Sequence, residues 1–250
     1  MFIPGVLVSV LIGASLGLLG GGGSILTVPT IHYLFGVEAH AAIASSLLVV
    51  GTTSLVALAP HLRAGNVRAR IGLVFGVSSM ASAYVAGRLS SHVPPGVLLV
   101  AFGAIMVVAA IAMLRPGRES APRPATPLGW LIVQGLLVGA VTGFVGAGGG
   151  FVIVPALVVL VGLPMQQAAA TSLLVIAMNS FVAFSATAQT VSLDGRVIGA
   201  VLAAAIVGGV VGSLLAGKIS PTRLRRWFGW LVLGMAVVIL AAELPTLVRG

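Results

Sequence analysis

Long apolar stretches dominate this chain, and they constrain its fold more than any other feature. Most reach the roughly 17–25 residues that a membrane-spanning helix needs, and none alternates with the period of two expected of a barrel strand. Of the 250 residues, 59% are hydrophobic and only 7% are charged, against about 25% charged in soluble domains. The sequence therefore predicts an all-α polytopic protein in the lipid bilayer.

Two of the apolar stretches, Ser24–Phe35 and Phe151–Val161, are too short to span comfortably. Each follows a cluster of glycines, which we expect either to break a helix or to turn the chain into a re-entrant hairpin, followed by three spanning helices. The other predicted helices are Phe2–Leu19, Ala39–Ala59, Ile71–Ala86, Val97–Leu114, Leu128–Val145, Gln166–Ala188, Val197–Ala216 and Trp227–Ala242.

The two halves of the chain are copies of one unit. At a fixed offset of 126 residues, positions 13–48 align with positions 139–174 without a gap, and six glycines and a proline recur. Shared apolar composition does not readily align so many glycines. Between the copies lies a basic, Pro-rich segment that cannot continue a helix. We predict a first repeat over 1–114, a cytoplasmic linker over 115–127 and a second repeat over 128–250.

The positive charges indicate how the copies are oriented. Three arginines lie between 63 and 70, whereas the equivalent loop of the second copy has Arg196, offset by a nearby aspartate. One helix later the bias is reversed, with Arg88 in the first copy and four basic residues between 218 and 226. Basic loops stay cytoplasmic, so the repeats should be inverted, as in many transporters. Ten basic residues would then lie inside and three outside, with both termini outside the cytoplasm.

The glycine clusters are the first candidate site. Glycine runs at membrane depth are tolerated where they are buried or line a cavity, and each run starts a short helix whose N-terminus offers free N–H groups to an anion. The alternative is that the glycines only let helices pack closely. The candidate substrate-binding residues here are Gly21, Gly22, Gly23 and Ser24 with Gly148, Gly149 and Gly150.

Polar side chains at equivalent depths form the second candidate group. Ser45 and Ser46 in the first copy correspond to Thr171 and Ser172 in the second, and Asn179 follows one to two turns later. Hydroxyls within helices can simply bond to their own backbone or to a neighbouring helix. Their duplication favours contacts with a substrate, and Asn179 is either a link between helices or a ligand donor.

Histidines are the titratable candidates near the predicted spans. His61 begins a basic loop and His32 lies on the first short helix, so either could serve in proton coupling or gating, although a lone histidine is more often structural. No Asp or Glu lies at the centre of a predicted span, so an anion would be held by neutral donors and helix ends.

Several classes of function are excluded by what the sequence lacks. Without cysteine there are no disulfides or thiolate sites, and no metal motif or nucleophile–base pair suggests an enzyme. The net charge of +9 reflects basic loops and not a nucleic-acid surface. We expect no cofactor and no metal. The oligomeric state, a homo-oligomer included, stays open.

The motif set resembles the TauE/SafE family of sulfite and organosulfonate exporters. The resemblance is carried by Gly20–Gly23 with Val28-Pro29, by the hydroxyl pairs, and by the run that starts at His61 and contains Gly65-Asn66-Val67. It covers nearly the whole chain. Ser45-Ser46 departs from the usual Thr-Ser, and no histidine in the second copy matches His61.

The resemblance implies an inner-membrane exporter of a small sulfur-containing or carboxylate anion. Together with the inverted repeats, it predicts alternating access at a site between the two copies. The alternatives are an anion channel and a transporter of another small carboxylate or sulfur compound. The partners expected are the anionic substrate and the bilayer.

Overall fold

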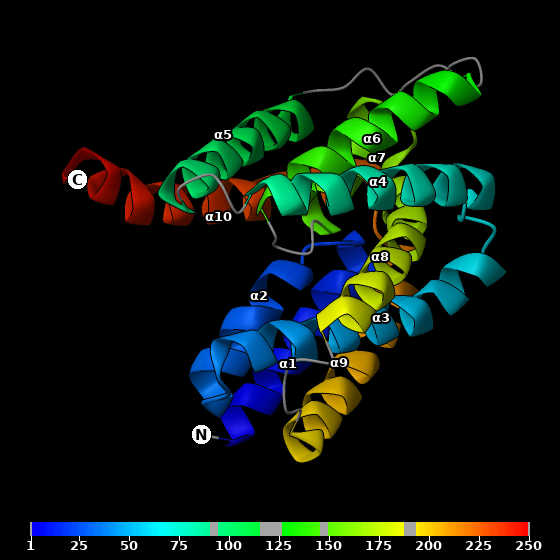
Figure 1. Ribbon diagram of the computed structural model, residues 1–250. Coiled ribbons are helices and arrows are strands. Elements are labelled where there is room, and N and C mark those ends of the chain that lie inside the picture. The colour runs from blue at the N-terminus through cyan, green and yellow to red at the C-terminus, as the bar shows by residue number, and fades with distance from the viewer. Residues whose placement is uncertain (1, 91–94, 116–126, 146–149, 188–193, 250) are drawn as a thin grey trace.

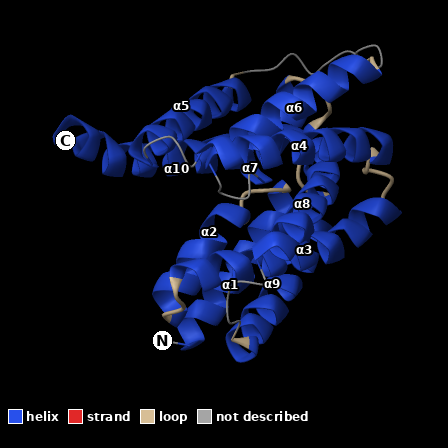
Figure 2. Ribbon diagram, in the orientation of Figure 1, coloured by secondary structure: helices blue, strands red, loops and turns tan. Residues whose placement is uncertain are grey.

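The computed structural model describes residues 2–90, 95–115, 127–145, 150–187 and 194–249. Helices and connecting loops make up this part of the chain, and no strand occurs among the described residues (Figure 2). The elements are α1 (Phe2–Leu19), α2 (Ser24–Pro29), η1 (Thr30–Leu34), α3 (Ala39–Arg63), α4 (Ala69–Ser90), α5 (Pro95–Leu114), α6 (Leu128–Val145), α7 (Gly150–Val159), α8 (Met165–Thr187), α9 (Gly195–Ala216) and α10 (Pro221–Arg249). Within the described residues, α3, α4, α8, α9 and α10 are long and apolar enough to cross a membrane. The predicted all-α polytopic fold is confirmed.

Most helix boundaries agree closely with those predicted, and the differences have physical reasons. The helix predicted to end at Ala59 continues to Arg63, because Pro60 lies in the last turns, where its missing N–H removes a single hydrogen bond. Helix α10 starts at Pro221, since proline suits the first turn of a helix, while the arginines that follow lower the local hydropathy. The short stretch after the first glycines divides at Pro29 into an α-helix and a π-helix.

Both short segments turn back beside the helix that precedes them. In the first half, the ring of Phe35 lies 2.5 Å from the position of a Cβ built on Gly5, so the end of η1 lies beside the start of α1. In the second half, the side-chain amide of Gln134 near the start of α6 donates to the Leu160 carbonyl just after α7 (3.0 Å). The end of each short segment therefore lies beside the start of the long helix that precedes it.

The two halves exchange helices. Helix α1 packs along α9, and its counterpart α6 packs along α4, in the two most extensive helix contacts of the structure. A Cβ on Gly13 would collide with the Ala205 backbone, and one on Gly139 would collide with the Ser79 backbone. The repeat offset of 126 relates Gly13 to Gly139 and Ser79 to Ala205. Small residues thus allow the backbones to touch at equivalent places in both interfaces.

Two groups of helices meet across a central crossing (Figure 1). One contains α1, α2, α3 and α9, and the other contains α4, α5, α6, α7 and α10, with α5 beside α10. Helices α3 and α8 pack against each other between the groups, where the Cβ of Ser180 lies 3.1 Å from the position of a Cβ on Gly51. Glycine at that point lets the two helices approach closely.

Basic loops from the two halves are joined at one end of the molecule. Arg68, between α3 and α4, donates through its Nε to the side-chain oxygen of Gln167 near the start of α8 (3.0 Å). The neighbouring Gln166 donates through its Nε2 to the Ile219 carbonyl between α9 and α10 (3.2 Å). Segments 61–70 and 218–226 therefore lie on the same side of the structure.

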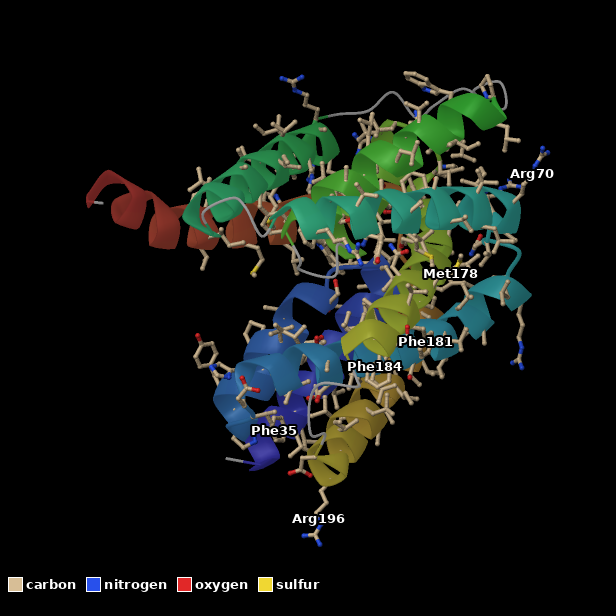
Figure 3. All side chains as sticks on the ribbon, in the orientation of Figure 1. Phe35, Arg70, Met178, Phe181, Phe184 and Arg196 are labelled. Carbon is tan, nitrogen blue, oxygen red and sulfur yellow. The ribbon has the colours of Figure 1, made fainter. Side chains whose placement is uncertain are left out.

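The end of α5 belongs to the same side. Arg225 at the start of α10 donates through its Nη2 to the Ala112 carbonyl near the end of α5 (2.7 Å). Figure 3 shows that Arg70 and Arg196, which the repeat offset relates, lie far apart, Arg70 at the upper right and Arg196 at the bottom of the view.

Candidate functional site

The first glycine segment meets the start of α7 at Gly21 and Gly150. A Cβ on Gly21 would collide with the carbonyl of Gly150 at the start of α7, and a Cβ on Gly150 would lie 2.8 Å from the Ser24 hydroxyl. The structure therefore brings together these residues of the candidate site, which come from opposite halves of the chain. Gly148 and Gly149 lie outside the described residues.

The other glycines of the first segment differ in what surrounds them. Gly20 has a φ of +76°, and a Cβ there would lie 2.5 Å from the Ala169 Cα of α8. A Cβ on Gly23 would collide with the Ile12 carbonyl. Close packing, which the sequence left open, accounts for glycine at these two positions. At Gly22 a Cβ would meet only leucine side chains, so backbone contact does not demand glycine there.

Two buried hydroxyls hold the glycine segment in place. The Ser24 hydroxyl donates to the Gly21 carbonyl (2.8 Å), and the Ser172 hydroxyl of α8 lies 2.6 Å from the Gly20 carbonyl and 2.8 Å from the Ala169 carbonyl. A hydroxyl has one proton, so Ser172 can alternate between its own helix and the opposite half. Both serines are buried and border the contact between the halves.

The equivalent pair on α3 is also buried, Ser45 at 2% and Ser46 at 5% exposure. Ser46 donates to the carbonyl of Ile43 three residues earlier (2.7 Å). This matches the local bond of Ser172, its counterpart on α8. The two helices thus carry serine in the same local geometry, as the repeat predicts.

Thr171 has a partner of its own. Its hydroxyl oxygen accepts a hydrogen bond from the backbone N–H of Arg68 (3.1 Å), and its side chain is fully buried. The bond fixes the start of α4 against α8. Thr171 therefore has a structural role in this structure, which the sequence pairing with Ser172 did not reveal.

Three polar side-chain atoms on α3 and α8 are buried without a hydrogen-bond partner. They are Asn179 Oδ1 on α8 and, on α3, Thr53 Oγ1 and Ser54 Oγ. Thr53 and Ser54 occupy the positions equivalent to Asn179 and Ser180. Leaving a buried polar atom unpaired costs about 1–3 kcal/mol. The three atoms therefore carry hydrogen-bonding capacity that the described residues leave unused.

One contact of Asn179, the hydroxyl of Ser79 on α4, was not predicted from the sequence. The Nδ2 of Asn179 lies 3.4 Å from Ser79 Oγ, which itself donates to the Gly76 carbonyl (2.9 Å). The contact places α4 beside the candidate site. The signal available was the Ser78-Ser79 doublet inside an otherwise apolar predicted span.

The two histidines have structural partners. His61 is buried, and its Nε2 donates to the Gly17 carbonyl of α1 (3.2 Å). His32 on η1 donates through its Nδ1 to the Val37 carbonyl (2.8 Å) and stabilises the turn that follows the hairpin. His61 links α3 to the helix that leads into the glycine segment, whereas the contact of His32 is local.

The chemistry available at the site is hydrogen bonding by neutral groups. The hydroxyls of Ser24 and Ser172 border the contact between Gly21 and Gly150, and the amide of Asn179 lies further along α8. Among the described residues, no group of three His, Asp or Glu side chains is placed to hold a metal ion. Neutral donors of this kind can bind the oxygens of a small anion.

Comparison with known proteins agrees with this description. A family model described as sulfite exporter TauE/SafE matches residues 5–239. A probable membrane transporter protein of Xylella fastidiosa (strain Temecula1) is 33% identical over 247 residues, which cover 95% of this chain and 94% of that protein. A probable membrane transporter protein of Bacillus subtilis (strain 168) is 25% identical over 177 residues, covering 68% of this chain and 72% of that protein. No solved structure matches the chain.

Proposed function

Because the chain belongs to the TauE/SafE family of sulfite exporters, we propose that this membrane transporter carries a small anion such as sulfite or an organosulfonate. The family description supports a sulfur oxyanion as substrate, and relatives named as probable membrane transporters support transport over catalysis. The proposed location is the inner membrane. An anion channel and a transporter of another small carboxylate or sulfur compound are the alternatives.

Inverted repeats are supported by the positions of equivalent charges. Arg70 and Arg196 occupy the same place in the two copies but lie far apart (Figure 3). Each hairpin returns to the side it came from, which leaves three crossings per half, and an odd number inverts the second copy. By the positive-inside rule, the end with segments 61–70 and 218–226 faces the cytoplasm. Both termini then lie on the other side.

The contact between Gly21 and Gly150 carries the proposed binding site. The hydroxyls of Ser24 and Ser172 border this contact, and each donates to a carbonyl of the glycine segment. When the two groups of helices separate at this contact, these hydroxyls and the neighbouring backbone N–H groups become free to bind an anion. When the groups of helices close again, the internal hydrogen bonds form again and release the anion on the other side. Alternating access between inverted repeats works in this way.

Outward movement of an anion needs no coupling ion. A membrane potential that is negative inside favours exit of one negative charge by about 2.3 kcal/mol per 100 mV. A site of neutral donors suits such a cycle, because neutral donors hold an anion less strongly than a fixed positive charge would and so release it more easily. Export is therefore the proposed direction.

Flux in proteoliposomes tests the proposal. The purified chain is reconstituted, and uptake of sulfite and of a small organosulfonate is measured with a chosen membrane potential. The Ser172→Ala variant removes the hydroxyl that bonds to both halves. Loss of one hydrogen bond to a charged group is worth about 1.5–3 kcal/mol, so the apparent affinity should fall roughly ten-fold or more.

The matched control is Ser185→Ala, which removes an exposed hydroxyl that bonds only within α8. This variant should retain normal flux. No flux of any sulfur oxyanion or sulfonate in the unmodified protein would contradict the proposal. Flux without saturation or counter-transport would indicate a channel instead.

A further inference from the structure

An apolar cavity of about 280 Å³ lies between α5, α6 and α7. Its walls include Ile105, Val108 and Ala109 of α5 and Leu137 of α6. Val108 and Leu137 are 68% and 60% exposed, so the cavity opens on the outer surface of the helices. In a membrane-spanning chain this surface faces the hydrocarbon of the bilayer.

One end of this cavity is basic. Along α5 the lining residues Ile105, Val108 and Ala112 follow one face of the helix, and the same spacing continues to Arg115, which is exposed. The carbonyl of Ala112 accepts the hydrogen bond from Arg225 Nη2. The Arg225 guanidinium therefore lies against the lining residue Ala112, and Arg115 follows Ala112 by three residues, at the end of the molecule that carries the basic loops.

Arg225 has donors to spare at this point. Its guanidinium carries five N–H groups. Within the described residues, an N–H on Nη2 donates to the Ala112 carbonyl. Its Nε is buried and has no partner. A buried charged donor without a partner is costly, and an anion at the mouth of the cavity would relieve this cost.

We infer that this cavity binds an anionic phospholipid, with one acyl chain against α5, α6 and α7 and its phosphate on Arg115 and Arg225. Apolar walls that end in positive charge complement an amphiphile, whereas a free phosphate gains nothing from them. Basic pockets between helices on the cytoplasmic side bind lipid head groups in this way.

The charge of the chain argues against a second copy as the occupant. The sequence has 13 basic and four acidic residues, so a copy seated on this face offers few carboxylates to the two arginines. A symmetric contact would also bring the same arginines of both copies together. Like charges placed opposite each other oppose association.

Lipid retention measured by native mass spectrometry tests the inference. The full chain is loaded in mild detergent with phosphatidylglycerol or, in parallel, with phosphatidylcholine. Phosphatidylglycerol should be retained in preference. Arg115→Gln should weaken its binding about five-fold, the effect expected for one basic residue near a lipid phosphate. Ala109→Leu, which fills the apolar part, should also weaken it.

Arg115→Gln and Ala109→Leu each have a matched control. Arg196→Gln removes an arginine at the start of α9, and Ala101→Leu enlarges an exposed alanine of α5 outside the cavity, so both should bind lipid normally. Because Arg225 also joins α5 to α10, the test depends on Arg115 and Ala109 and not on Arg225.

Three results would overturn the inference. They are equal retention of the two lipids, loss on Arg115→Gln without loss on Ala109→Leu, and disulfide-linked dimers of Val108→Cys. The first would show that binding does not depend on the charge of the lipid head group. The second would show that the lipid contacts Arg115 without entering the apolar cavity. The third shows a second copy over the cavity, and it is readable because the chain has no cysteine of its own.

Discussion

Replacement of Gly20 by alanine should destabilise the protein far more than the same change at Gly36. Both glycines have positive φ, +76° and +70°. They differ in their surroundings, since a Cβ on Gly20 would lie 2.5 Å from the Ala169 Cα and from Ser172 Oγ, whereas one on Gly36 would meet nothing within 4 Å. The comparison therefore separates backbone strain from contact between the halves.

The structure allows the difference to be estimated. Left-handed backbone costs an alanine about 1–2 kcal/mol, and this cost is common to Gly20→Ala and Gly36→Ala. At Gly20, forcing α8 away adds about 1–3 kcal/mol, and loss of the Ser172 bond adds about 0.5–1.5 kcal/mol. For a chain of this size, about 2–4 °C in Tm corresponds to 1 kcal/mol. Gly20→Ala should therefore lower Tm by roughly 3–18 °C more than Gly36→Ala.

Thermal unfolding in mild detergent, followed by size-exclusion chromatography of the remaining folded protein, measures both variants. Gly65→Ala is a second control, because Gly65 also has positive φ (+68°) and open space around its Cβ position. The three variants should separate into one strongly and two weakly destabilised proteins. Equal losses at all three positions would refute the argument that the glycine segment is packed against α8.

Three further predictions concern side chains. Asn179→Leu should change stability by less than about 1 kcal/mol, because the amide oxygen is already unpaired and the contact of Nδ2 with Ser79 is long at 3.4 Å, but it should lower anion flux in proteoliposomes. Thr171→Val should lower the free energy of unfolding by about 1–3 kcal/mol, since it leaves the Arg68 N–H without its acceptor, and the affinity of the remaining folded protein for the anion should be unchanged. Asp194→Ala should cost about 1 kcal/mol, because Asp194 accepts from two N–H groups at the start of α9, whereas Asp194→Asn should keep most of the stability.

The sequence predicted local structure and equivalence between the halves better than long-range contact. Helices such as Phe2–Leu19 and Leu128–Val145 were predicted with their exact bounds, because apolar runs in a bilayer have little alternative to helix. The repeat predicted that the glycine clusters and the serine pairs of the two copies occupy equivalent positions. The meeting of Gly21 with Gly150 was expected in outline, since symmetry places equivalent segments together.

Partners far apart in the sequence could not be predicted in the same way. That Thr171 receives the Arg68 N–H depends on how α8 meets the loop before α4, which no local pattern specifies. The exchange of α1 and α9 was also missed, although Gly13 and Gly17 have the spacing of small residues used in close helix contacts. Spacing of this kind shows which face packs, but not against which helix.

The exchange of helices has a consequence for synthesis of the chain. Gly13 of α1 packs on Ala205 of α9, which the ribosome reaches roughly 190 residues later, about 10–40 s at 5–20 residues per second. During this time α1 is in the membrane without the surface that covers its glycines. The insertion machinery or bound lipid has to shelter it, and a nascent chain released after α5 would expose this face to other proteins of the membrane.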